Sequence, residues 1–176
     1  MFEIKPMDPT LYRQQTRRST LIIALTFAVL AMFFSGLAVM LLGVPGGDNF
    51  SLNVGGVIVG LALTVVLVRG HFWSKPWMAS AVYGWRLKRS LMSVTNVMHH
   101  VTAGVQASDP TAIKLLRFYH LGLTQMHQLD ANSSALSQAV HEIDRHKELM
   151  EAKAMDTDQS RLDPAWLDAM KSKTTK

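Results

Sequence analysis

Cysteine is absent from the 176 residues of this chain. Its absence excludes disulfides, thiolate nucleophiles, cysteine-ligated zinc and iron–sulfur clusters. It fits a cytoplasmic location without proving one, because many exported proteins also lack cysteine. Charge is scarce over a long stretch as well, since residues 19–68 hold a single charged side chain, Asp48. The chain therefore has an apolar first part and a second part, residues 69–176, with the composition of a soluble helical protein.

Two apolar stretches within this first part are long enough to cross a bilayer. Residues 21–42 contain no charged side chain and only two polar ones, Thr26 and Ser35. As a helix they span about 33 Å, against a hydrocarbon core of about 30 Å, and residues 50–68 span about 28 Å. The segment between them, VPGGDN, consists mostly of turn-forming residues. The sequence predicts an all-α membrane protein with a two-span transmembrane helical hairpin over residues 19–68.

A cleaved signal peptide and a buried hairpin in a soluble protein are the competing interpretations. Gly36 and Ala38 resemble the small residues of a cleavage site, but the first stretch is too long for a signal peptide and a second span follows it. The rest of the chain is too small to cover two such helices in water. We therefore expect an uncleaved hairpin in contact with the lipid bilayer.

Lys and Arg side chains are distributed unevenly around the two spans. The leader, residues 1–18, carries four, residues 69–89 carry five, and the loop between the spans carries none. Because positive side chains favour the cytoplasmic side, we expect both termini in the cytoplasm. This pattern explains the net charge of +5 better than nucleic-acid binding does, so no nucleic-acid partner is expected.

Residues 69–89 form a juxtamembrane segment that mixes aromatic and basic side chains. Such a mixture is typical of the lipid headgroup layer. We expect Trp73 in that layer. Trp77 and Trp85 fit the layer and the core of a soluble domain equally well.

Residues 76–170 predict a cytoplasmic helical bundle of three to four helices. The first is expected from Pro76 to about Val105, with a heptad-like seam typical of bundles that consists of Leu87, Leu91, Val94, Met98, Val101 and Val105. The second, from Asp109 to about Leu129, is apolar around most of its circumference, so we expect it to be the most buried.

Two further helices complete this bundle. One is expected after residues 132–134, with a charged outer face, and a short one after Asp163 and Pro164. Residues 171–176 are expected to be disordered. No strand pattern is present beyond isolated short runs.

Seven histidines raise the question of a metal site: His71, His99, His100, His120, His127, His141 and His146. His120 and His127 share one helix face but lie about 10 Å apart along its axis, too far to bind one ion together. His141 and His146 are spaced less favourably still, and the HExxH and di-iron Glu-x-x-His patterns are absent. A site assembled across helices stays open. We expect His120 and His127 to edge a polar face, and we predict no metal ligand, cofactor-binding or catalytic residue.

Gly56 and Gly60 lie one helical turn apart in the second span, a spacing that lets two helix backbones approach closely. The first span also has a small face, which consists of Ala24, Ala28, Ala31 and Ser35. The simplest use of the glycines is packing between the two spans. A partner protein or a homodimer is the alternative.

Four segments carry a resemblance to a known family: YRQQTRRST at 12–20, VTNVMHH at 94–100, KLLRFYHLGLTQMHQLD at 114–130 and LDPAW at 162–166. Together they resemble a bacterial membrane family catalogued as domain of unknown function 3087. The resemblance extends over nearly the whole chain. It implies a bacterial inner-membrane location and transfers no catalytic residue.

Two functions of different classes are compatible with these features. The first is a non-enzymatic membrane-anchored interaction module or accessory subunit, whose helical domain engages a protein partner or a second copy. The heptad-like seam and the lack of a catalytic motif favour it. The second is a metal- or ligand-binding sensor or enzyme that uses histidines of the cytoplasmic helices. Three histidine or carboxylate side chains within bonding distance would favour that second function.

Overall fold

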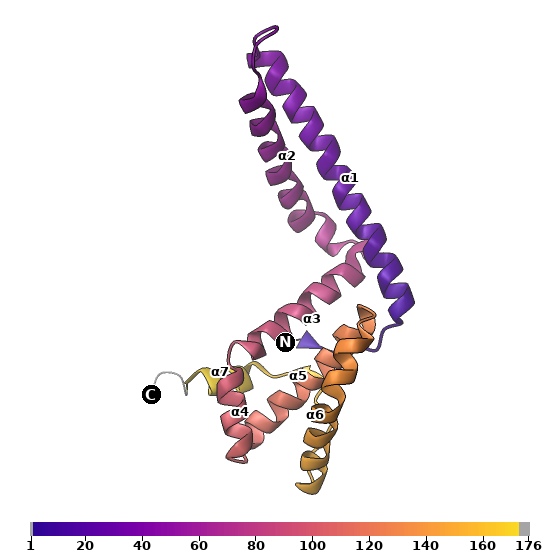
Figure 1. Ribbon diagram of the computed structural model, residues 1–176, viewed down its shortest axis with the longest axis vertical. Helices are drawn as coiled ribbons and strands as arrows, with labels where there is room; N and C mark the ends of the chain where they lie inside the picture. The colour runs from indigo at the N-terminus through magenta and orange to yellow at the C-terminus, as the bar shows by residue number, and fades with distance from the viewer. Residues whose placement is uncertain (1, 173–176) are drawn as a thin grey trace. The chain divides into compact units, whose positions relative to one another are not determined.

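The computed structural model describes residues 2–172, most of them in helices (Figure 1). The chain divides into two compact units. The hairpin unit consists of residues 14–82, and the helical unit joins the N-terminal arm, up to Arg13, to the chain from Tyr83 onward. In the sequence, the hairpin unit is therefore an insertion within the helical unit.

The hairpin unit is built mainly from α1, Pro9–Leu42, and α2, Phe50–Gly70 (Figure 1). The Ser35 hydroxyl donates to the Asn53 side-chain oxygen at 2.7 Å. Further along α2, Gly60 faces Ala31, which lies earlier in α1 than Ser35 does. The two helices therefore run in opposite directions. This contact supports the interpretation that the glycine face packs between the two helices.

The helix α1 begins before the apolar stretch, so the expected polar leader is not a separate segment. Pro9 occupies the first turn, and the Asp8 carboxylate accepts the Leu11 N–H at 2.8 Å, as an N-cap residue does. Within the described residues 2–172, two helical stretches are long and apolar enough to cross a membrane, Pro9–Leu42 and Phe50–Ser74. In their most apolar windows, 6% and 17% of the residues are buried by the rest of the protein.

Two short 3-10 turns follow α2, at Phe72–Ser74 and Pro76–Met78. Trp77 is half-buried and packs edge-on against Phe72, with ring centroids 5.2 Å apart. Both residues belong to the hairpin unit, so Trp77 lies outside the core of the helical unit.

The helical unit contains the larger part of α3, Ala79–Thr95. Its other helices are α4, Met98–Gln106; α5, Pro110–Leu129; α6, Ser133–Ala152; and α7, Pro164–Ser172. The expected single helix from Pro76 to Val105 is wrong, because the chain breaks between Thr95 and Met98. The β-branched and asparagine side chains around this point have low helix propensity. The break lets α3 and α4 each pack on α5, with Val94, Val97 and Val101 all buried.

The predicted starts of α5 and α6 are confirmed. The Asp109 carboxylate accepts the Thr111 N–H at 2.9 Å before Pro110, and the Asn132 side chain caps α6. The end of α7 differs, since this helix includes Lys171 and Ser172, where disorder was expected. The other four residues of that expected tail lie outside the described residues.

A two-stranded antiparallel pair joins the N-terminal arm to the C-terminal region. It consists of β1, Phe2–Glu3, and β2, Arg161–Leu162. The Ile4 N–H extends it by donating to the Ser160 carbonyl at 2.9 Å. Strands of two residues carry no detectable alternation, so the sequence did not reveal this pair.

The core of the helical unit lies around α5, which is the most buried helix, as predicted. Phe118 is fully buried against residues of α4 and α7, and a second cluster joins Tyr12 to Leu87, Leu91 and Leu129. The heptad-like seam faces inward, with Met98 and Val105 partly buried and its other members buried. Trp85 is 48% exposed and belongs to neither cluster, so the core interpretation of Trp85 is wrong.

Candidate functional site

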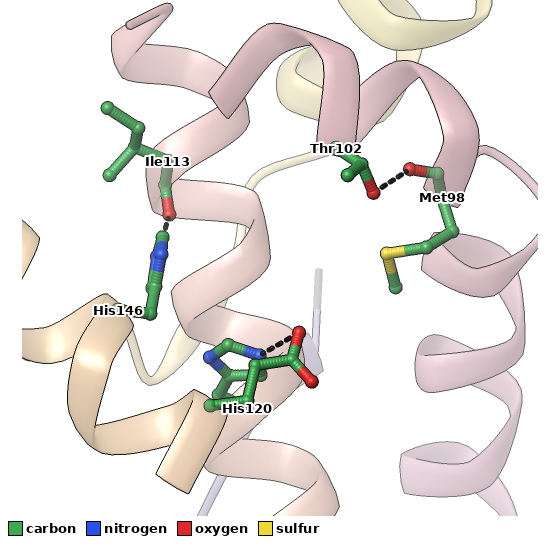
Figure 2. A network of polar contacts seen from close by, with 6 residues as sticks. Met98, Thr102, Ile113, His120 and His146 are labelled. Atoms are coloured by element: carbon green, nitrogen blue, oxygen red, sulfur yellow. Dashed lines mark hydrogen bonds and ion pairs between the residues drawn. The ribbon is translucent and has the colours of Figure 1, made fainter. Parts of the chain in front are cut away.

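Two histidines from different helices meet inside the helical unit (Figure 2). His120 of α5 and His146 of α6 are both buried, and their ring centroids lie 5.1 Å apart at an interplanar angle of 84°. His120 was expected to edge a polar face together with His127. That expectation is wrong for His120, because α6 packs over this side of α5.

The two imidazoles differ in their hydrogen bonds. His146 Nε2 lies 3.0 Å from the Ile113 carbonyl oxygen, which accepts, so the proton belongs on Nε2 (Figure 2). His120 Nδ1 is buried and has no hydrogen-bond partner among the described residues. His120 Nε2 lies 3.9 Å from a carboxylate oxygen of Glu142, whose side chain is largely exposed. The Thr102 hydroxyl, also drawn in Figure 2, donates to the Met98 carbonyl within α4.

Burial sets the charge of this cluster. It lowers the pKa of His120 to about 4, and the neighbouring His146 and Arg117 act in the same direction. Burial lowers the pKa of His146 as well. Both imidazoles are therefore neutral at neutral pH. A base with a pKa of about 4 abstracts protons poorly at pH 7, so His120 is not suited to general base catalysis there.

Arg117 connects the cluster to the chain that follows α6. Its side chain is buried, and Nε donates to the Thr157 carbonyl at 2.9 Å. Its pKa is lowered, mainly by burial, yet a guanidinium stays charged in proteins. The cluster thus holds α5 against α6 and against the segment that leads into β2, and these contacts give it a structural role.

Metal binding would need more ligands than this pair provides. Across residues 2–172, no three His, Asp or Glu side chains gather in a geometry that could hold a metal ion. His99 and His100 are adjacent residues of α4, with ring centroids 3.8 Å apart, and His71 follows α2. The structure therefore brings His120 and His146 together, and no third His, Asp or Glu side chain of the described residues completes a metal site with them.

A second polar cluster fixes the N-terminal arm to the helical unit. The Lys5 N–H donates to the Tyr83 hydroxyl oxygen at 3.1 Å, and that hydroxyl donates to the Gln125 side-chain oxygen at 3.0 Å. The Gln125 side-chain N–H in turn donates to the Lys5 carbonyl. Burial of the hydroxyl raises the pKa of Tyr83. The sequence carries no local signal for these contacts, because the three residues are far apart along the chain.

One surface of α3 combines exposed apolar and basic side chains, and we call it the α3 face. It consists of Trp85, Arg89 and Met92, whose spacing of four and three residues places them on one side of the helix. Trp85 and Met92 are 48% and 65% exposed. The Arg89 guanidinium lies 5.1 Å from the centre of the Trp85 ring, within cation–π range. Large exposed apolar groups beside basic ones are typical of interaction surfaces.

The fold and these clusters define a class: a largely helical protein with two helices long and apolar enough to cross a membrane and a separately packed helical unit. The chain belongs to the family described as protein of unknown function DUF3087, whose model matches residues 2–167. This confirms the family resemblance seen in the sequence. No curated protein and no solved structure matches the chain.

Proposed function

We propose that this chain is a non-enzymatic membrane-anchored interaction module of the bacterial inner membrane. In this proposal α1 and α2 cross the bilayer as a hairpin, both termini lie in the cytoplasm, and the helical unit engages a protein partner there. The observation that carries the proposal is the outward direction of the large apolar side chains of α1 and α2.

Leu25, Met32 and Leu41 of α1 are 65%, 77% and 69% exposed, and Val66 of α2 is 65% exposed. A soluble protein rarely leaves a continuous apolar surface of this length in water. A core helix of a soluble protein would be covered by the rest of the chain, and these two are not. Lipid is the environment that accepts such a surface at no cost.

The distribution of positive charge supports the proposed orientation. Counted back from Leu42, a core of about 30 Å takes up about 20 residues of α1, so Arg13, Arg17 and Arg18 would lie beyond it. The same length counted from Phe50 ends near Arg69. The loop between the helices contains no Lys or Arg. Positive residues beside both outer helix ends favour a cytoplasmic location for those ends.

The α3 face supports the interaction part of the proposal. A half-exposed tryptophan, an exposed methionine and an arginine on one helix face provide residue types that are enriched at protein interfaces. The buried histidine cluster, by contrast, has a structural role and a weakly basic imidazole.

The test combines topology with cross-linking. Alkaline phosphatase inserted at Gly47 should be active, and the same reporter after the last residue should be inactive. A photoreactive residue at Met92 should then form a discrete protein adduct in cells, whereas one at Val140, also an exposed apolar position but on α6, should not. An active reporter at the C-terminus would refute the orientation. Equal labelling at both positions would refute the α3 face as the partner surface.

A histidine-based ligand site is the second candidate. The observation in its favour is the buried His120 Nδ1, which lacks a hydrogen-bond partner among the described residues. We expect the purified protein to hold no stoichiometric transition metal, because the cluster provides too few converging ligands. Elemental analysis that found about one zinc or iron per chain, lost in His120→Ala, would establish this second candidate instead.

A further inference from the structure

An apolar groove of about 440 Å³ opens between α1 and α2 within the hairpin unit. Ala24 and Phe27 line it from α1, and Leu61 and Val65 line it from α2. Thr20 and Arg69 lie at its polar end. The groove lies next to the close contact of Gly60 with Ala31, since its lining begins one residue after Gly60 on α2 and four residues before Ala31 on α1. From Phe27 to Thr20 it extends about 10 Å along α1.

The polar end of the groove carries positive charge that the described part of the chain leaves unneutralised. Arg69 is exposed and forms no ion pair with any residue from 2 to 172. Arg17 lies one helical turn from Thr20 and continues the face formed by Thr20, Ala24 and Phe27. The hairpin unit contains one acidic residue, Asp48, and it belongs to the loop at the opposite end of the helices.

The depth of these residues in a bilayer follows from the proposed membrane hairpin, on which this inference rests. About 20 residues of helix cross the hydrocarbon core, which places Thr20 and Arg69 at the level of the lipid phosphates. Guanidinium groups bind phosphate oxygens in a bidentate manner. An apolar groove with Arg69 at its phosphate-level end, and Arg17 one helical turn beyond Thr20 on the same face of α1, matches a phospholipid, whose acyl chain is apolar and whose headgroup is anionic.

We propose that the groove between α1 and α2 binds one anionic phospholipid, with an acyl chain between Phe27 and Leu61 and the phosphate held by Arg69 and Arg17. This site differs from general attraction to an anionic leaflet, because it needs both the groove and the arginines on its own face. Arg18 provides the comparison. It is adjacent to Arg17 and exposed, but it points about 100° away from the groove face.

The experiment uses the full-length protein in mild detergent, with retained lipid measured by native mass spectrometry. Phosphatidylglycerol and phosphatidylcholine are added at equal concentration. The wild type should retain one phosphatidylglycerol in preference to phosphatidylcholine. Arg69→Gln should lower that retention about tenfold, the loss expected for one charge-assisted contact. Arg18→Gln should leave it unchanged. Ala24→Leu, which fills the groove without changing charge, should lower retention of both lipids.

Several results would overturn the site. Equal losses in Arg18→Gln and Arg69→Gln would reduce it to general surface attraction. Unchanged binding in Ala24→Leu would place the lipid outside the groove, and a wild-type dimer that Ala24→Leu dissociates would show that a second copy fills it. The Arg69 comparison does not depend on the folding of Ala24→Leu, because Arg69 is exposed at the helix end. A protein that stays in the soluble fraction without detergent would instead refute the membrane proposal.

Discussion

The hairpin unit and the helical unit bury opposite kinds of side chain. Between α1 and α2 the buried residues are small, such as Ala31, Gly56 and Thr64, while leucine, valine, methionine and phenylalanine face outward. In the helical unit the fully buried residues are large, such as Phe118 and Leu115. In water, apolar area drives burial at about 25 cal/mol per Å². In the lipid environment that we propose for the hairpin unit, no such force acts between the helices, and close backbone approach takes its place.

The largest expected effect contrasts two phenylalanines. Phe118→Ala should destabilise the helical unit by about 3–5 kcal/mol, because it removes a fully buried ring and leaves a cavity. Phe33→Ala should change stability little, since that side chain is 58% exposed on α1. Denaturant unfolding of the full-length protein in mild detergent, followed by circular dichroism, measures both. Comparable losses in the two variants would show that Phe33 is covered by a partner under those conditions.

Two adjacent glycines of α2 test whether close backbone approach holds the hairpin unit together. A Cβ on Gly56 would overlap the Ser35 backbone, whereas a Cβ on Gly55 would meet nothing within 4 Å. Gly56→Leu should therefore separate the helices and cost about 3 kcal/mol, the upper range for overpacking. Gly55→Leu should be nearly neutral, because leucine is favourable in lipid.

Cross-linking can follow the separation of the helices in this pair of variants. The chain has no cysteine, so a disulfide introduced between positions 35 and 53 would be the only one. It should form readily in the Gly55→Leu background and poorly with Gly56→Leu. Equal yields would mean that the glycine face does not hold the hairpin together.

Of the two units, the helical unit is the one whose stability should fall in moderate acid. The folded-state pKa of His120 is about 4 against an ordinary 6.5, so the unfolded chain binds the proton more tightly between these values. Stability is complete above pH 6.5 and declines as the pH falls toward 4. At pH 5 the loss should be about 2 kcal/mol relative to pH 7.5, and His146 adds to it in the same direction.

Unfolding as a function of pH tests this, with two variants as comparison. His120→Asn should flatten the dependence, while His99→Asn, an exposed site on α4, should leave it in place. If wild type and His120→Asn lose stability in parallel, other groups govern the acid response.

The smallest effect is expected at the surface of the helical unit. Lys88 Nζ lies 2.9 Å from an Asp130 carboxylate oxygen, and both side chains are substantially exposed. Lys88→Ala should cost less than about 1 kcal/mol, because solvent and salt screen such pairs. A double-mutant cycle with Asp130→Ala measures the coupling, and a value near that of a buried pair would contradict the exposure of the site.

The sequence predicted features that depend on neighbouring residues. The cap at Asp109 with Pro110, the cap before α6 and the apolar circumference of α5 are local patterns, and each matches the structure. The contact of Gly60 with Ala31 could also be predicted from the sequence, because packing between the two spans is the simplest use of small residues at helical spacing and needs no third helix.

The remaining features depend on tertiary contacts. The pairing of His120 with His146 depends on how α6 lies across α5, which spacing within one helix does not reveal. The break between α3 and α4 was hidden by a continuous seam, since both segments present apolar residues to the same helix. The strand pair and the tie of Lys5 to Gln125 join residues more than a hundred positions apart, so no sequence window contains both partners.

The order of synthesis affects when the N-terminal arm can form its contacts. Glu3 and Arg161, an ion pair at 3.0 Å, are 158 positions apart. The ribosome therefore releases the arm first, Tyr83 and Gln125 emerge next, and the strand β2 that pairs with β1 emerges near the end of translation. Closing so long a loop is slow compared with forming local helices. During that interval α1 and α2 are complete while the helical unit still lacks its last segment, so chains truncated before Arg161 would keep the contacts of Lys5 with Tyr83 and Gln125 but would lack the strand that pairs with β1.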